Sequence, residues 1–245
     1  MNGPTATDLT LLLPELILVG AALVLILAAR RIREGSVASV GTVIAALAAA
    51  IAAWQALSWG TTTGFGGMLV LDGYSQFFKI LIAATVVIAA LLSAGRSDGK
   101  GVPRGEYHVL MLLAATGMML MASTTDLIPL YLGLELMTIC SYILVGIRVE
   151  RPTSSEAAIK YFLLGSFASA LLLFGISLTY GLTGTTAYAG IAAALAGPEP
   201  LSQPFLLVAI GLIAAGLAFK IAAVPFHAWA PDAYEGASAP VAGFL

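Results

Sequence analysis

Long apolar runs follow one another along this chain, with short polar linkers between them. A helix needs about 20 residues to cross the hydrocarbon core of a bilayer, and seven runs come close to that length. They cover residues 9–29, 37–57, 74–95, 107–123, 126–147, 155–181 and 203–224. An eighth run opens near Pro240 and is still apolar at Leu245, so we expect the sequence to be a piece of a longer chain. The pattern predicts an all-α, polytopic bundle of seven transmembrane helices and the beginning of an eighth.

The composition also indicates a membrane protein and excludes several other classes. Hydrophobic residues make up 60% of the chain and charged residues 10%, whereas soluble domains carry about 25% charged residues. The net charge of −2 and the absence of a basic run argue against a nucleic-acid partner. A single cysteine, Cys140, excludes internal disulfides, and no cluster of Cys or His predicts a metal or haem site. The TGFGG sequence at 63–67 lies in a linker, so it does not predict a phosphate-binding loop.

Basic residues alternate along the linkers, and this alternation predicts the orientation. Lys and Arg are retained on the cytoplasmic side of a membrane. Those after the first, third and fifth runs are Arg30, Arg31, Arg33, Arg96, Lys100, Arg104, Arg148 and Arg151. The other linkers carry only acidic residues, namely Asp72, Asp126 and Glu199. The pattern therefore places the N-terminus outside, and the first run, which no Lys or Arg precedes, is interpreted as a mature helix and not a secretory signal.

Glu135 is the clearest candidate for a functional charge inside the membrane. Asp126 can cap the fifth helix, and nine residues at about 1.5 Å each place Glu135 about 13 Å from its outer end. A carboxylate at that depth is either protonated or held by a cation, and charges in membrane spans usually mark ion or proton paths.

Two lysines lie nearer to the helix ends. Lys160 follows an acidic first turn in the sixth run, where it could belong to a proton path, snorkel to the cytoplasmic interface or pair with Glu156 at i,i+4. Lys79 lies equally near the outer end of the third run, and we expect it to snorkel to the surface.

Lys220 precedes a predicted break in the seventh run. Pro225 lacks an N–H donor and clashes with the carbonyl of Ile221, so the helix should end within about a turn of the lysine. Pro231 and the glycine- and proline-containing stretch at 236–240 are expected to prevent a clean resumption. Broken helices are tolerated at membrane depth where they are buried in protein or line a watery cavity. His227, just past the break, is either part of a proton relay with Lys220 or an ordinary polar residue.

Four segments carry a resemblance to a known family. The run PFHAWAPDAYEGASAPVAGF after Lys220 resembles the antiporter-like membrane subunits of respiratory complex I. Its DAYEG version is most similar to subunit N of the bacterial NADH-quinone oxidoreductase, while sibling subunits and multisubunit sodium/proton antiporters share the wider frame. The remaining segments are LLPEL with Glu15, LGLELMTICSYIL around Glu135, and EAAIKYFLLGSFASALLLFG around Lys160.

The resemblance implies a fold of about fourteen helices with two inverted five-helix repeats. Residues 1–105 would be the three N-terminal helices, and 106–245 the first repeat with its eighth helix truncated. Glu135, Lys160, Lys220 and His227 would form a proton relay, in which moving the influence of Glu135 toward or away from Lys220 makes the lysine take up or release a proton. The lysines of the eighth and twelfth helices of the family lie outside this sequence.

The resemblance also implies a setting for the chain. It would be a proton translocase subunit in the bacterial cytoplasmic (inner) membrane, packed against other membrane subunits of the complex and especially neighbouring antiporter-like subunits. It would hold no cofactor, because NADH, FMN, iron–sulfur clusters and quinone belong to partner subunits. Two alternatives stay open: a sodium/proton antiporter subunit, and a helical scaffold subunit whose charges only hold helices together.

Overall fold

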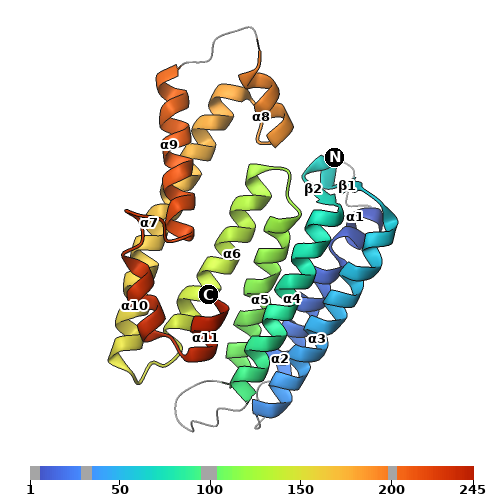
Figure 1. Ribbon diagram of the computed structural model, residues 1–245, viewed down its shortest axis with the longest axis vertical. Helices are drawn as coiled ribbons and strands as arrows, with labels where there is room; N and C mark the ends of the chain where they lie inside the picture. The colour runs from blue at the N-terminus through green and yellow to red at the C-terminus, as the bar shows by residue number, and fades with distance from the viewer. Residues whose placement is uncertain (1–5, 29–34, 95–103, 198–202) are drawn as a thin grey trace.

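The computed structural model describes residues 6–28, 35–94, 104–197 and 203–245, which form a bundle of long, roughly parallel helices (Figure 1). The α-helices are α1 Ala6–Leu11, α2 Leu13–Ala28, α3 Gly35–Ala56, α4 Gly73–Ala94, α5 Arg104–Ala122, α6 Leu127–Val145, α7 Pro152–Thr183, α8 Tyr188–Leu195, α9 Gln203–Lys220, α10 Trp229–Gly236 and α11 Ala239–Phe244. Two short strands, β1 Thr62–Gly64 and β2 Leu69–Leu71, and two 3₁₀ turns, Leu57–Trp59 and Phe65–Gly67, join α3 to α4.

Each of the seven predicted runs corresponds to a helix, but the helices differ in length. Within the described residues, five helices are long and apolar enough to cross a membrane: Ser36–Trp59, Gly73–Ala94, Gly105–Ala122, Leu127–Val145 and Pro152–Thr183. The first and seventh runs form shorter apolar helices, Leu13–Ala28 and Pro204–Lys220. A turn at Leu12 divides the first run, because Pro14 has no N–H to bond the carbonyl of Thr10. Length alone thus supports a polytopic membrane fold without confirming the count of seven.

The prediction of an all-α fold missed one small sheet. β1 and β2 pair antiparallel with Thr62 opposite Leu71, and the turn between them uses Gly66 and Gly67 at positive φ. The N–H of Val70 donates to the carbonyl of Ser123 at 2.7 Å, which ties the hairpin to the turn between α5 and α6. The hairpin therefore fixes one end of the bundle.

Close helix packing depends on small residues. α5 contacts α2, α3, α4 and α6, and a Cβ on Gly133 of α6 would lie 2.7 Å from the carbonyl oxygen of Gly117 on α5. α7 and α9 also pack closely, since a Cβ on Gly216 would lie 3.0 Å from the carbonyl oxygen of Ala168. Together with the α6–α7 contact, these crossings place α6, α7 and α9 around the side chain of Lys220.

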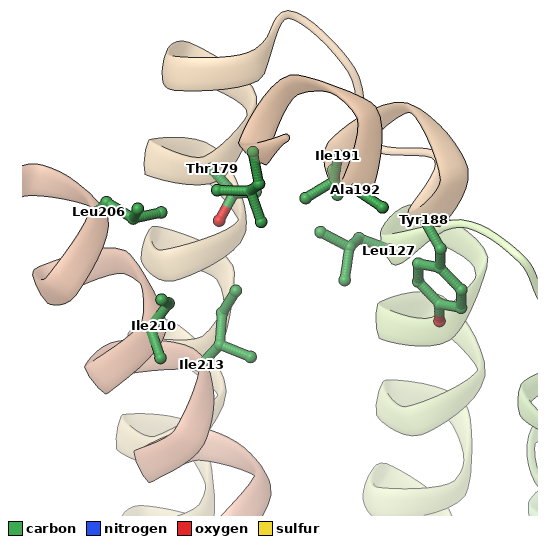
Figure 2. A pocket seen from close by; sticks show the side chains of 9 residues that line it. Leu127, Thr179, Tyr188, Ile191, Ala192, Leu206, Ile210 and Ile213 are labelled. Carbon is green, nitrogen blue, oxygen red and sulfur yellow. The ribbon is translucent and has the colours of Figure 1, made fainter. Parts of the chain in front are cut away.

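A pocket of about 300 Å³ opens between α6, α7, α8 and α9 at their end near α8 (Figure 2). Its lining is almost entirely apolar and includes Leu127, Ile191, Leu206, Ile210 and Ile213. The side chain of Asp126 accepts a hydrogen bond from the N–H of Ile128 at 2.8 Å beside this pocket, so the predicted cap of the fifth transmembrane run is confirmed.

Candidate functional site

The predicted break after Lys220 is present. α9 ends at Lys220, and residues 221–228 form turns before α10 begins. The carbonyl of Phe219 accepts from the N–H of Ala222 at 3.1 Å and from the indole Nε1 of Trp229 at 2.9 Å. The indole therefore joins the end of α9 to the start of α10 across the break.

The helix does not resume directly after the break: residues 221–228 form turns, and the short helix that follows ends at Gly236, where the 236–240 stretch begins. α10 runs from Trp229 to Gly236 with Pro231 as its third residue. The first turn of a helix has no intrahelical partners for its N–H groups, so a proline there costs no hydrogen bond. The resumed helix is nevertheless only eight residues long.

Lys220 reaches two hydroxyl groups on neighbouring helices. Its Nζ donates to Thr138 Oγ1 of α6 at 2.9 Å and to Ser169 Oγ of α7 at 3.4 Å. Both hydroxyl residues are buried, and Lys220 itself is partly buried. The lysine at the break thus completes a polar site built from α6, α7 and α9.

Glu135 lies beside this site without a direct bond to the lysine. It precedes Thr138 by three residues on α6, which places both on one face of the helix. Its Oε1 is buried and has no hydrogen-bond partner within the described part of the chain, where no Glu135–Lys220 ion pair forms either. A buried carboxylate oxygen without a donor needs a proton or a water molecule, so the arrangement suits proton exchange.

Lys160 is held apart from these two residues. Its Nζ lies 2.8 Å from Glu156 Oε1 and 3.0 Å from Asp232 Oδ2, and its side chain is 45% exposed. The predicted i,i+4 pair with Glu156 is therefore present, and Asp232 adds a second carboxylate from α10. Nine residues of α7, or about 13 Å, separate Lys160 from Ser169.

Three aromatic rings pack together near Lys160, and the sequence patterns did not reveal them. The rings of Tyr161 and Trp229 are nearly parallel with centroids 4.3 Å apart, and Tyr142 meets Tyr161 edge-on at 4.6 Å. The hydroxyl of Tyr142 is buried and has no hydrogen-bond partner among the residues described. Because these rings come from α6, α7 and α10, no single run of sequence could have indicated their contact.

His227 is exposed within the break, with its backbone carbonyl accepting from the N–H of Ala230 at 3.0 Å. The described contacts do not bring its side chain to Lys220 or Glu135. The structure therefore groups Lys220 and Glu135, sets Lys160 at one end with Asp232, and leaves His227 on the surface.

The interpretation of Lys79 as a snorkelling residue was wrong. Only 1% of its side chain is exposed, and its Nζ lies 2.8 Å from Glu15 Oε1, whose side chain is 5% exposed. Both residues lie in the outer third of a predicted helix and carry opposite charges, but nothing in either run indicates that the two helices are neighbours. The buried carboxylate of Glu15 keeps the ammonium group of Lys79 inside the bundle, so the lysine does not extend to the membrane surface.

Several residues of the orientation argument lie outside the described residues: Arg30, Arg31, Arg33, Arg96, Lys100 and Glu199. Arg148 and Arg151 lie in the turn between α6 and α7, at the end of the bundle that also holds Lys160.

Replacing Trp229 by phenylalanine should loosen the break next to Lys220. The variant keeps the ring stack but loses the hydrogen bond to the carbonyl of Phe219, which is worth about 1 kcal/mol. Backbone amides at 219–229 should then exchange with deuterium about fivefold faster, as judged by mass spectrometry. Amides of α3, which lie outside this contact, serve as the control, and unchanged exchange at the break would contradict the role assigned to the indole.

Comparison with known proteins connects this geometry to a family. Residues 122–245 match the family model described as "NADH:quinone oxidoreductase/Mrp antiporter, TM". NADH-quinone oxidoreductase subunit N of Desulfovibrio desulfuricans is 45% identical over 99% of this chain and 49% of its own length. The subunit N 2 protein of Rhizobium meliloti is 42% identical over 95% of this chain and 48% of its own length.

Solved structures give the same picture. A chain of respiratory complex I from Thermus thermophilus superposes with a TM-score of 0.77 at 31% identity, covering 94% of this chain and 49% of that one. A chain of an archaeal membrane-bound sulfane sulfur reductase superposes with a TM-score of 0.82 at 25% identity, covering 96% of this chain and 49% of that one. This chain spans about half the length of the curated relatives it matches.

Proposed function

This chain belongs to the NADH:quinone oxidoreductase/Mrp antiporter transmembrane family, and from that membership we propose that it is part of a subunit N that translocates protons across a bacterial cytoplasmic membrane. The observation that carries the proposal is the polar site at the helix break. Lys220 bonds to hydroxyls of two other helices there, next to the Oε1 atom of Glu135, which has no hydrogen-bond partner among the residues that the structure describes. An amine and a carboxyl group that lie close without an ion pair can exchange a proton through an intervening water.

In this proposal the residues take three roles. Glu135 and Lys220 exchange the proton at the centre of the membrane. Lys160 receives or delivers it at the cytoplasmic end, where Glu156 and Asp232 hold its ammonium group. His227, exposed in the break, is placed to exchange a proton with a group beyond the described contacts, such as the lysines expected on later helices.

The proposal includes a topology and a setting. Seven helices cross the membrane with the N-terminus outside, 1–105 form the N-terminal helices, and 106–245 form the first repeat with the start of its eighth helix. Redox chemistry with NADH, FMN, iron–sulfur clusters and quinone belongs to partner subunits. Neighbouring antiporter-like subunits pack against this one, as the likeness to chains of multisubunit membrane complexes supports.

Neutralising Glu135 tests the proposal. Glu135→Gln in the full-length subunit should leave the complex assembled, because glutamine keeps the shape of the side chain. Proton uptake into vesicles, driven by NADH oxidation, should fall about 100-fold, the usual scale for loss of a positioned proton-transfer group. The matched control is Glu150→Gln, the same change on an exposed turn residue, which should pump normally.

The outcomes separate the proposal from its alternatives. Wild-type proton uptake per electron in Glu135→Gln would overturn the relay, and failure to assemble would favour a scaffold role. A chain of the Mrp complex from Dietzia also superposes well, with a TM-score of 0.76 at 25% identity. Uptake that depends on sodium would therefore favour sodium/proton antiport.

A further inference from the structure

A second buried ion pair lies outside the proposed relay. Lys79 of α4 and Glu15 of α2 meet at 2.8 Å, with 1% and 5% of their side chains exposed. Burying two charges costs several kcal/mol per ion before their attraction is counted. Charged residues inside membrane bundles mark ion or proton sites far more often than inert structure.

The pair is located at a helix break, as Lys220 is. α1 ends at Leu11 and α2 begins at Leu13. Lys79 Nζ also donates to the carbonyl of Leu11 at 3.2 Å, so the ammonium group binds both sides of the break. Broken helices whose freed backbone groups meet a charge are the usual construction of ion sites in membrane transporters.

Two acceptor atoms near this pair need donors. Glu15 Oε2 is buried and has no hydrogen-bond partner among the described residues, and the same holds for Oε1 of the fully buried Gln76. Gln76 lies one helical turn before Lys79, on the same face of α4. A water molecule supplies two donors and is the common solution for buried polar groups of this kind. A metal cation fits poorly, because the ammonium group of Lys79 would repel it.

The pair also lies near one end of the bundle. Asp8, partly exposed on α1, accepts a hydrogen bond at 2.7 Å from the N–H of Phe65 in the β1–β2 hairpin. Asp8 precedes Leu11 by three residues and therefore lies on the same side of α1. A carboxylate of α1 thus contacts the hairpin, which caps this end of the bundle (Figure 1).

We propose that Glu15, Lys79 and Gln76 form a second proton-exchange site, which binds at least one water molecule at Glu15 Oε2 and opens toward the hairpin end of the bundle. Transfer of a proton from Lys79 Nζ to Glu15 breaks an N–H bond and forms an O–H bond. The ion pair becomes a neutral amine and a neutral acid, so the net charge of the site is unchanged. The water carries protons between Glu15 Oε2 and the hairpin side.

The first test looks for the water directly. An experimental density map of the full-length complex that resolves ordered water should show density within about 3.2 Å of Glu15 Oε2. A dry Oε2 in such a map overturns the proposal, and this measurement needs no variant and no pumping assay.

The second test removes the exchangeable protons while keeping the shape and the net charge of the site. Glu15→Gln combined with Lys79→Met should assemble, because it removes both members of the pair together. Its proton-to-electron ratio in vesicles should fall to about half or less. Thr42→Val is the matched control, since Thr42 is equally buried in α3 but donates only to its own helix, to the carbonyl of Ala38.

The pumping readout rests on the proposed function, but the two can fail separately. If the wild-type complex moves no protons, the proposed function fails and the density map still decides this site. If the wild type pumps and the assembled double variant keeps the wild-type ratio, the proton-exchange role of Glu15 and Lys79 is overturned. If the double variant does not assemble, the density map alone decides whether a water molecule is bound at Glu15 Oε2.

Discussion

Proton pumping should fall to background when Lys220 is replaced by alanine in the full-length subunit, with the complex still assembled. Lys220 is the only amine that reaches the hydroxyls of Thr138 and Ser169 within the described residues, so no neighbour can take over its proton. The expected loss is about 100-fold or more. Assembly should survive, because Thr138 still donates to the carbonyl of Leu134 and water can replace the ammonium group.

The measurement combines proton uptake by reconstituted vesicles, NADH oxidation and an immunoblot for the assembled complex. Thr179→Val is a suitable control. Thr179 is buried on α7, the helix that also carries Ser169, and its hydroxyl donates to the carbonyl of Gly175 within that helix. Normal pumping by Lys220→Ala would rule out the lysine as a proton carrier. Loss of the subunit from the complex would instead indicate that Lys220 mainly holds α6, α7 and α9 together.

Lys79→Ala should have the largest effect on folding. The substitution leaves the carboxylate of Glu15 buried without its cation, and breaking a buried pair in this way costs about 3–5 kcal/mol. Whole domains are stable by only about 5–15 kcal/mol, so the amount of subunit in membranes should fall several-fold. Immunoblots of membranes and the melting temperature of the purified complex measure the loss.

Rescue provides the control for this prediction. The double variant Glu15→Gln, Lys79→Met removes both charges, and methionine fills the space that alanine leaves empty. The amount of subunit in membranes should therefore return toward the wild-type level. Full accumulation of Lys79→Ala alone would mean that Glu15 does not need its partner for stability.

The comparison of Lys220 with Lys79 shows what the sequence can predict here. Both are single lysines in apolar runs, but Lys220 is followed by Pro225, and the break that a proline causes is a local signal. Lys79 has its partner 64 residues earlier in the chain, at Glu15, and a depth measured along one helix says nothing of the helix beside it. The same limit hid the contacts of Tyr142, Tyr161 and Trp229, which come from three helices.

Short elements were missed for a different reason. The β1–β2 hairpin and α10 contain few residues, and the rule of about 20 apolar residues detects only elements that cross the bilayer. Glycine at positive φ in the hairpin and proline in the first turn of α10 are favourable in those places. Residues that usually interrupt structure therefore support it here.

α10 holds two parts of the proposed relay at once. Through Trp229 it binds the carbonyl of Phe219, the residue before Lys220, and through Asp232 it binds the ammonium group of Lys160. Trp229 and Asp232 are three residues apart on one short helix, so they move as a rigid unit. The two lysines of the proposed relay therefore share one support, so a substitution that removes α10 should disturb the surroundings of both at once.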